Sequence, residues 1–142
     1  MIFSTCFTPD GATLAGGSED HYVRLWDVQS GQLLHTLEGH RDWVTYVAFS
    51  PDGHTIAAAG SARSNRAVQL WDITDPRNPT SLANLPHTSD EFGHATLAFG
   101  VDGRTLITAL GYQRAQVWNV SDLRRPAAKR KPPPTTWVSS SV

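Results

Sequence analysis

The segment FSPDG at residues 49–53, followed by LWD at residues 70–72, decides the fold of this 142-residue chain. Two modified copies of this pattern occur in the same chain: FTPDG at 7–11 with LWD at 25–27, and FGVDG at 99–103 with VWN at 117–119. The three tryptophans therefore lie 45 and 47 residues apart (71 − 26 and 118 − 71). A repeat of this length indicates a chain built from similar structural units that stack side by side.

Each copy alternates turn signals with strand signals. The Pro-Asp-Gly sequence is typical of a tight turn, because proline fixes φ at the second turn position and glycine accepts a positive φ. Segments rich in Val, Ile, Thr, Phe, Tyr and Trp between such turns predict strands. We expect strands at residues 2–8, 13–17, 22–28, 32–37, 43–50, 55–60, 67–72, 81–85, 95–100, 105–111 and 115–120.

These copies resemble the repeats of the WD-repeat β-propeller family, and the resemblance covers about residues 3–120. It implies an all-β fold in which each repeat forms one blade, a four-stranded antiparallel sheet. The expected blades are residues 2–38, 40–86 and 87–120, which together form a partial propeller. Closed propellers take about four to eight blades. About three blades therefore cannot close a ring by themselves.

Residues 121–142 break the repeat pattern. They hold five basic residues between 124 and 131, then three prolines and a Ser-rich end. We interpret this segment as a flexible, basic, Pro/Ser-rich tail, with a short strand at 135–139 as an alternative for part of it. The third repeat then lacks a recognisable outer strand, and no spare strand precedes the first repeat. We therefore expect this chain to be a fragment, the C-terminal part, of a longer propeller.

The composition excludes several classes of protein. The formal net charge is −1 and the pI is about 6.6, so the repeats lack the basic surface that binds nucleic acid non-specifically. The single cysteine, Cys6, rules out an internal disulfide framework. No segment has the roughly 18 apolar residues of a membrane span, and none has the pattern of a secretory signal. These features predict a soluble, cytoplasmic protein that makes no membrane contact.

In the resembled family, each blade is held together by a buried hydrogen-bonded set of a His, a Ser or Thr, an Asp and the repeat Trp. The resemblance implies this structural role for Asp20 and Trp26 in the first blade, His40, Asn65 and Trp71 in the second, and His87 (or His94), Thr108 and Trp118 in the third. No blade keeps the whole set. Gly16 and Ala58 stand at the hydroxyl positions of the first two blades, and Tyr112 replaces the acid of the third.

Two groups of residues have side chains that could perform chemistry. The blade residues look superficially like a nucleophilic triad, but catalysis needs an exposed Ser beside an oxyanion hole, and two blades lack the hydroxyl. His87, Asp90, Glu91 and His94 have the side chains of metal ligands, but their spacing matches no closed structural site. We interpret residues 87–94 as a solvated loop. The sequence therefore predicts no catalytic residues, no metal and no cofactor.

Proteins of the resembled family usually bind their partners through the loops at one end of the blades. The corresponding loops here carry Arg and aromatic side chains, which often anchor protein interfaces: Arg41, Trp43, Arg63, Arg66, Phe92, Tyr112 and Arg114. We therefore expect a non-catalytic scaffold for protein partners. Two alternatives stay open: a homodimer in which two such chains close a six-bladed ring, and part of a propeller hydrolase with its site at the central channel.

Overall fold

The computed structural model describes residues 1–60, 67–85, 95–110, 114–123 and 126–128. This part of the chain contains no helix able to cross a membrane. Its secondary structure consists of strands: β1 Ile2–Phe7, β2 Thr13–Ser18, β3 Val23–Asp27, β4 Leu33–Leu37, β5 Val44–Phe49, β6 Thr55–Gly60, β7 Val68–Asp72, β8 Thr80–Leu85, β9 Thr96–Phe99, β10 Thr105–Leu110, β11 Arg114–Asn119 and β12 Ala127–Ala128.

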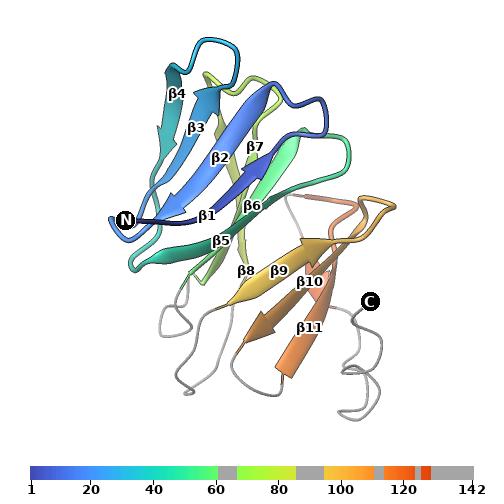
Figure 1. Cartoon of the computed structure of the whole chain (residues 1–142). Helices are drawn as coiled ribbons and strands as arrows, with labels where there is room; N and C mark the ends of the chain where they lie inside the picture. The colour runs from blue at the N-terminus through green and yellow to red at the C-terminus, as the bar shows by residue number, and fades with distance from the viewer. Residues whose placement is uncertain (61–66, 86–94, 111–113, 124–125, 129–142) are drawn as a thin grey trace.

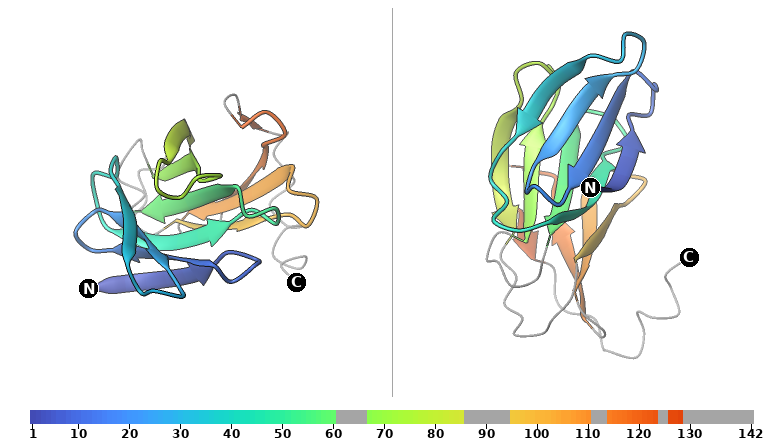
Figure 2. Two further views of the ribbon diagram at one scale, coloured as in Figure 1. Left: turned by 90° about the horizontal axis from the view of Figure 1, so that it is seen from above. Right: turned by 60° about the vertical axis from the view of Figure 1, so that its left-hand side comes forward.

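The strands form three four-stranded antiparallel sheets, which we call the first, second and third blades (Figure 1). Within each blade every strand pairs with the next one along the chain: β1-β2-β3-β4, β5-β6-β7-β8 and β9-β10-β11-β12. The blades lie side by side, with β1 against β5 and β5 against β9 (Figure 2). The prediction of an all-β fold made of incomplete propeller blades is confirmed.

The third blade has a fourth strand that the sequence did not predict. Ala127 pairs with Asn119 and Ala128 pairs with Trp118, so β12 lies at the edge of β11. Two alanines carry neither the alternation nor the β-branched side chains that announce a strand, and they fall inside the segment expected to be a tail. The alternative strand at 135–139 lies outside the described residues. The domain boundary at residue 120 stays a prediction.

The Asp-Gly turns are held by the aspartate side chain. Asp10 Oδ1 accepts hydrogen bonds from the Thr8 hydroxyl at 2.7 Å and from the Ala12 amide at 2.9 Å. Asp52 Oδ1 accepts the same two bonds, from the Ser50 hydroxyl at 2.5 Å and from the amide two residues further on at 2.9 Å. The glycine that follows each aspartate has a φ of +72° or +75°, which other residues adopt only with strain. Each turn is thus stabilised by its own residues.

The third turn differs by one hydroxyl. Asp102 accepts the equivalent amide bond from Arg104 at 2.9 Å. Gly100, however, stands at the position of Thr8 and Ser50, and it has no side chain to donate the second bond. A Cβ atom added to Gly100 would lie 3.2 Å from Asp102 Oδ1. The Gly103 amide donates to the Gly100 carbonyl at 3.0 Å, as the equivalent glycine does in the other two turns, so the backbone of the turn keeps their geometry.

Two apolar clusters form the core, one between each pair of neighbouring blades. The cluster between the first and second blades contains Ala15, Val23, Leu25, Leu37, Val44, Val47, Phe49, Ile56, Ala58, Trp71 and Ile73. The cluster between the second and third blades contains Ala57, Ala59, Val68, Leu70, Leu85, Ala95, Leu97, Leu106, Trp118 and Val120. Because the second blade has a cluster on each face, its strand β6 is buried along its whole length.

Candidate partner-binding surface

The third blade contains a direct bond between two residues of the implied structural set. Trp118 on β11 donates from its indole Nε1 to the Thr108 hydroxyl on β10 at 3.0 Å, and both residues are buried. Thr108 pairs with Gln116 across the two strands, so Trp118 is its diagonal neighbour on the same face of the sheet. The bond therefore links the two middle strands of the blade from within the core.

In the second blade, His40 packs against the repeat tryptophan. The ring centroids of His40 and Trp71 lie 5.8 Å apart, and both side chains are buried. Burial lowers the pKa of His40 to about 4, with a smaller effect from the charge of His21, so the imidazole is neutral at pH 7. Its Nε2 has no hydrogen-bond partner among the described residues. The loop that carries it is held by Gln69, whose Nε2 donates to the Gly39 carbonyl at 2.7 Å.

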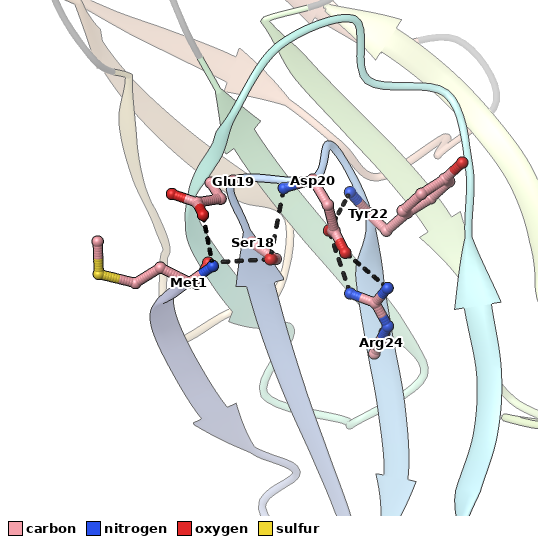
Figure 3. A network of polar contacts seen from close by, with 6 residues as sticks. All are labelled: Met1, Ser18, Glu19, Asp20, Tyr22 and Arg24. Atoms are coloured by element: carbon pink, nitrogen blue, oxygen red, sulfur yellow. Dashed lines mark hydrogen bonds and ion pairs between the residues drawn. The ribbon is translucent and has the colours of Figure 1, made fainter.

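In the first blade, Asp20 forms a surface ion pair. Arg24 donates to both carboxylate oxygens of Asp20, at 2.7 and 3.1 Å, and the Asp20 side chain is 45% exposed (Figure 3). The bonds from Arg24 lower the pKa of Asp20 to about 2. The guanidinium of Arg24 also lies over the Tyr22 ring, 5.5 Å from its centroid. Asp20 thus orders the loop between β2 and β3 at the surface, whereas the resemblance implied a buried role.

Trp26, the repeat tryptophan of the first blade, lies over a glycine. A Cβ atom on Gly16 would come within 2.9 Å of Trp26 Cζ3 and 3.5 Å of Ile2 Cγ2. Because Gly16 has no side chain at this hydroxyl position, the Trp26 ring can pack directly against the backbone of β2. The three repeat tryptophans thus make three different contacts: with a glycine, an imidazole and a hydroxyl.

Several of the sequence predictions fall outside the described residues. These are Asn65 and His87 of the implied structural set, Arg63, Arg66, Phe92 and Tyr112 of the predicted binding loops, and the group His87, Asp90, Glu91 and His94. Arg114 is the first residue of β11, where its backbone pairs with Leu110. The roles assigned to these residues stay predictions.

Two of the predicted binding residues, Arg41 and Trp43, lie together in the loop between β4 and β5. The Trp43 ring packs against the Phe3 ring of β1 in a tilted arrangement, with the centroids 5.5 Å apart and an interplanar angle of 36°. Both rings remain accessible, with Trp43 45% and Phe3 38% exposed, and Arg41, two residues before Trp43 in the chain, is also exposed. We call Phe3, Arg41 and Trp43 the aromatic rim.

Two glycines position the rim. A Cβ atom on Gly17 would lie 2.7 Å from Val44 Cγ1, and one on Gly60 would lie 2.6 Å from the Trp43 carbonyl oxygen. Because these positions carry no side chain, β2 and β6 approach the start of β5 closely. The Trp43 amide also donates to Asp42 Oδ1 at 2.8 Å. The backbone beneath the Trp43 ring is therefore fixed on two sides.

The start of β1 is tied to the end of β2 by a network of polar contacts (Figure 3). The Met1 carbonyl accepts hydrogen bonds from the Ser18 hydroxyl and from the Glu19 amide, each at 2.9 Å. The Glu19 carboxylate forms an ion pair with the Met1 amino group at 2.9 Å. Phe3, two residues further along β1, is thereby held in its place against Trp43.

Sequence reasoning missed Phe3 as a surface residue, because it belongs to an apolar segment assigned to an inner strand. A signal was available in the register of the copies. Asp10 and Asp52 lie 42 residues apart, and Asp52 and Asp102 lie 50 apart, which aligns Phe3 with Thr45 and Ala95. A large ring at a position where the other copies have small residues indicates a feature particular to the first blade.

At the opposite end of the inner strands lies a depression of about 450 Å³ to which all three blades contribute. Its lining includes the apolar residues Phe7, Tyr46, Phe49, Leu97, Phe99 and Val101. The lining carries Cys6 and Ser50 but no carboxylate and no imidazole, so it offers no pair of groups for general acid–base catalysis. No cluster of three potential metal ligands occurs in the described ranges.

Comparisons with known proteins match the same repeats. The sequence profile of the family described as "WD domain, G-beta repeat" matches residues 2–27 and 31–72, in the first two blades. The small ribosomal subunit protein RACK1 of Drosophila melanogaster is 29% identical over 124 residues, which are 80% of this chain and 36% of RACK1. The periodic tryptophan protein 2 homolog of Schizosaccharomyces pombe is 33% identical over 115 residues, 80% of this chain and 12% of that protein.

A third relative matches a shorter segment more closely. The probable serine/threonine-protein kinase PkwA of Thermomonospora curvata is 58% identical over 41 residues, which are 29% of this chain and 6% of the kinase. This chain thus spans about a third or less of the length of each of these relatives. The profile, the relatives and the three tryptophan-bearing sheets agree, and the chain belongs to the WD-repeat family, of which it carries a partial set of about three blades.

Proposed function

We propose that this chain acts as a non-catalytic scaffold for protein partners, as part of a longer WD-repeat propeller. The aromatic rim is the observation that carries the proposal. Tryptophan and arginine are the side chains that most often anchor protein interfaces, and the rim presents both beside a second ring. Because the strand ends beneath them are fixed, the rings lose little conformational freedom when a partner binds.

The names of the relatives support a role in binding partners, because these names indicate different activities. One is named as a ribosomal subunit protein and another as a kinase, yet this chain matches only 6% of the kinase. What the relatives share with this chain is therefore the repeats. Because the repeats occur in proteins with such different named roles, we infer that they bind partners and do not catalyse a reaction. The cytoplasmic location stays a prediction from the sequence.

The proposal of a longer propeller is supported by the number of blades. Three blades are fewer than the about four to eight that close a ring. The relatives named above extend well beyond the segment that they share with this chain. The hydrolase alternative has no comparable support, because the lining of the depression at the inner strands provides no acid–base pair.

The scaffold proposal is tested by capture of partners from extracts of cells that express the protein. The full chain and its Arg41→Ala and Trp43→Ala variants are immobilised at equal density, and the bound proteins are quantified by mass spectrometry. We expect a defined set of proteins to be captured by the unmodified chain and reduced at least about tenfold by Trp43→Ala, since an anchor residue contributes about 2 kcal/mol or more.

Val101→Ala is the matched control, because Val101 is fully exposed in the turn after β9, away from the rim. It should leave the captured set unchanged, and far-UV circular dichroism should show the same fold for all variants. A captured set that does not respond to either rim substitution would contradict the assignment of this surface.

A further inference from the structure

A buried glutamine contacts the loop that carries Arg41 and Trp43, which we call the rim loop (residues 38–43). Gln69 lies on β7, between β6 and β8, and is 4% exposed. A neutral amide in such a position needs hydrogen-bond partners, because burying an unpaired polar group costs free energy. Its Nε2 donates to the Gly39 carbonyl at 2.7 Å, so the middle of the second blade is joined to the start of the rim loop.

The contact between Gln69 and Gly39 is close. Gly39 has a φ of +138°, which residues with a side chain rarely adopt, and a Cβ atom there would lie 2.6 Å from Gln69 Oε1. A carbonyl oxygen only accepts hydrogen bonds, so the Gly39 carbonyl orients the amide nitrogen toward itself. The amide of Gln69 therefore occupies the space that a side chain at residue 39 would need.

Strand β7 makes two successive contacts with the rim loop. Because side chains alternate between the two faces of a strand, Gln69 and Trp71 lie on the same face of the second blade. Gln69 bonds to Gly39, and the Trp71 ring packs against the ring of His40, the next residue of the loop, with the centroids 5.8 Å apart. The two exposed rim residues of the loop follow one and three residues later. The chain that leads to them is thus held at two consecutive positions.

The corresponding positions of the other blades carry Arg24 and Gln116, each two residues before the repeat tryptophan. Arg24 donates to the Asp20 carboxylate at the surface (Figure 3). The first blade thus folds with a different side chain and a different contact at this position. The bond of Gln69 with the rim loop is therefore not a requirement of the blade itself.

We propose that Gln69 is a positioning residue for partner binding by the aromatic rim. The inference rests on the proposed function, and it gives Gln69 no contact with the partner. The bond to Gly39 holds the rim loop in the conformation that presents Arg41 and Trp43 and that places the Trp43 ring against Phe3. Without this bond the binding-competent conformation is one of several, and the apparent affinity falls in proportion to its population.

The position of the Trp43 ring is tested by fluorine NMR of the full chain labelled with fluorotryptophan. The chain has five tryptophans, and the Trp43→Phe variant identifies the signal of Trp43. The Phe3→Leu variant gives the signal that Trp43 has without the neighbouring ring. Gln69→Leu keeps a side chain of similar size but removes the donor. In this variant we expect the Trp43 signal to shift toward its position in Phe3→Leu.

Two controls separate a positioning role from a general loss of stability. Gln116→Leu makes the same change at the corresponding position of the third blade. Thr108→Val removes a buried hydrogen bond of the third blade, so it destabilises the chain without a change at the rim loop. Both controls should leave the Trp43 signal where it is in the unmodified chain.

Gly39→Ala breaks the same contact from the loop side, because its Cβ would meet Gln69 Oε1. It should move the Trp43 signal in the same direction as Gln69→Leu, and it decides the question if far-UV circular dichroism shows that Gln69→Leu does not fold. A Trp43 signal that stays unchanged in the folded variants would overturn the inference.

The capture assay of the proposed function provides the second measurement. Gln69→Leu should reduce the captured proteins that depend on Trp43 by about three- to tenfold, the effect of one hydrogen bond on the population of the competent loop. Gln116→Leu should not change them. Full capture by Gln69→Leu, together with the loss expected for Trp43→Ala, would overturn this inference and leave the proposed function intact. If Trp43→Ala itself has no effect, the proposed function fails, and the fluorine signal still decides whether Gln69 holds the rim loop.

Discussion

The first and second blades follow the same sequence plan but differ in what covers them. In the second blade, Val44, Val47 and Phe49 of the innermost strand β5 are buried, and Ile73 is 3% exposed. In the first blade, β1 is exposed at every second position or more, and Val28, which corresponds to Ile73, is 44% exposed. Because the residue types agree, the neighbour and not the sheet itself determines the burial. The stability of each blade is therefore the sum of its own contribution and of its interfaces.

The comparison predicts its largest difference in stability for truncation of Ile73 and of Val28, the corresponding residues of the second and first blades. Ile73→Ala should lower the free energy of unfolding by about 2 to 4 kcal/mol, because it removes a side chain from the cluster between two blades. Val28→Ala should change it by less than about 0.5 kcal/mol. Urea unfolding of the two variants and of the unmodified chain measures both changes. Equal costs would show that burial by the neighbour is not the cause of the difference.

The second blade should also make the free energy of unfolding depend on pH. His40 titrates near 6.5 when unfolded and at about 4 when folded, because burial disfavours its charged form. As the pH falls below 6.5 the unfolded state binds the proton first, so the stability present above pH 6.5 decreases. Between pH 7.5 and pH 4.5 the loss should be about 2 to 3 kcal/mol.

The measurement is urea unfolding at a series of pH values, restricted to values above 4.5. Carboxylates with lowered pKa values, such as Asp20, contribute stability above their unfolded pKa and lose it only below that range. In the His40→Gln variant the dependence should disappear, whereas substitution of the exposed His54 by Gln should preserve it. A His40→Gln variant with the same slope as the unmodified chain would contradict the assignment.

A smaller effect on stability is expected when the hydrogen bond between Trp118 and Thr108 of the third blade is removed. Thr108→Val keeps the shape of the side chain but removes the acceptor of the 3.0 Å bond from Trp118, which should cost about 1 kcal/mol. Thr108→Ser keeps the acceptor and serves as the control. Thermal unfolding followed by tryptophan fluorescence measures both variants. If Val is tolerated better than Ser, the bond does not stabilise the blade.

The smallest effect concerns the third turn. Gly100→Ser should supply the hydroxyl that Thr8 and Ser50 provide in the other turns, and we expect a gain of about 0.5 to 1 kcal/mol in stability. Ser50→Gly in the second turn should produce a loss of similar size. Paired melting temperatures provide the comparison, and a loss of stability with Gly100→Ser would show that the added Cβ is not accommodated beside Asp102.

Much of the fold could be predicted because its signals are local. The Asp-Gly turns and the strands ending in tryptophan are specified by residues within each repeat, and the structure places a strand at each predicted location. Strand β12 could not be predicted, because its two alanines have no pattern and are held only by pairing with Trp118 and Asn119. A strand defined by its partner leaves no signal in its own residues.

The candidate site was predictable only in part. Arg41 and Trp43 could be proposed because their residue types and loop position are visible in the sequence. The contact between Trp43 and Phe3 depends on how two blades stack, and that is a property of the tertiary fold. The same reason applies to the role of Asp20. Its resemblance to a buried family residue does not reveal that it forms an ion pair with Arg24 at the surface.

The turn bonds of Asp10 and Asp52 span only two residues in either direction, and this has a consequence for folding during translation. A hairpin closed by such local bonds forms within about 1 to 10 μs. A ribosome that adds about 5 to 20 residues per second needs about 2 to 9 s to supply the next repeat of some 45 residues. The turn hairpins therefore form long before the next repeat has been synthesised. The rate of translation then determines how long the apolar surface of a blade stays exposed before its neighbour covers it.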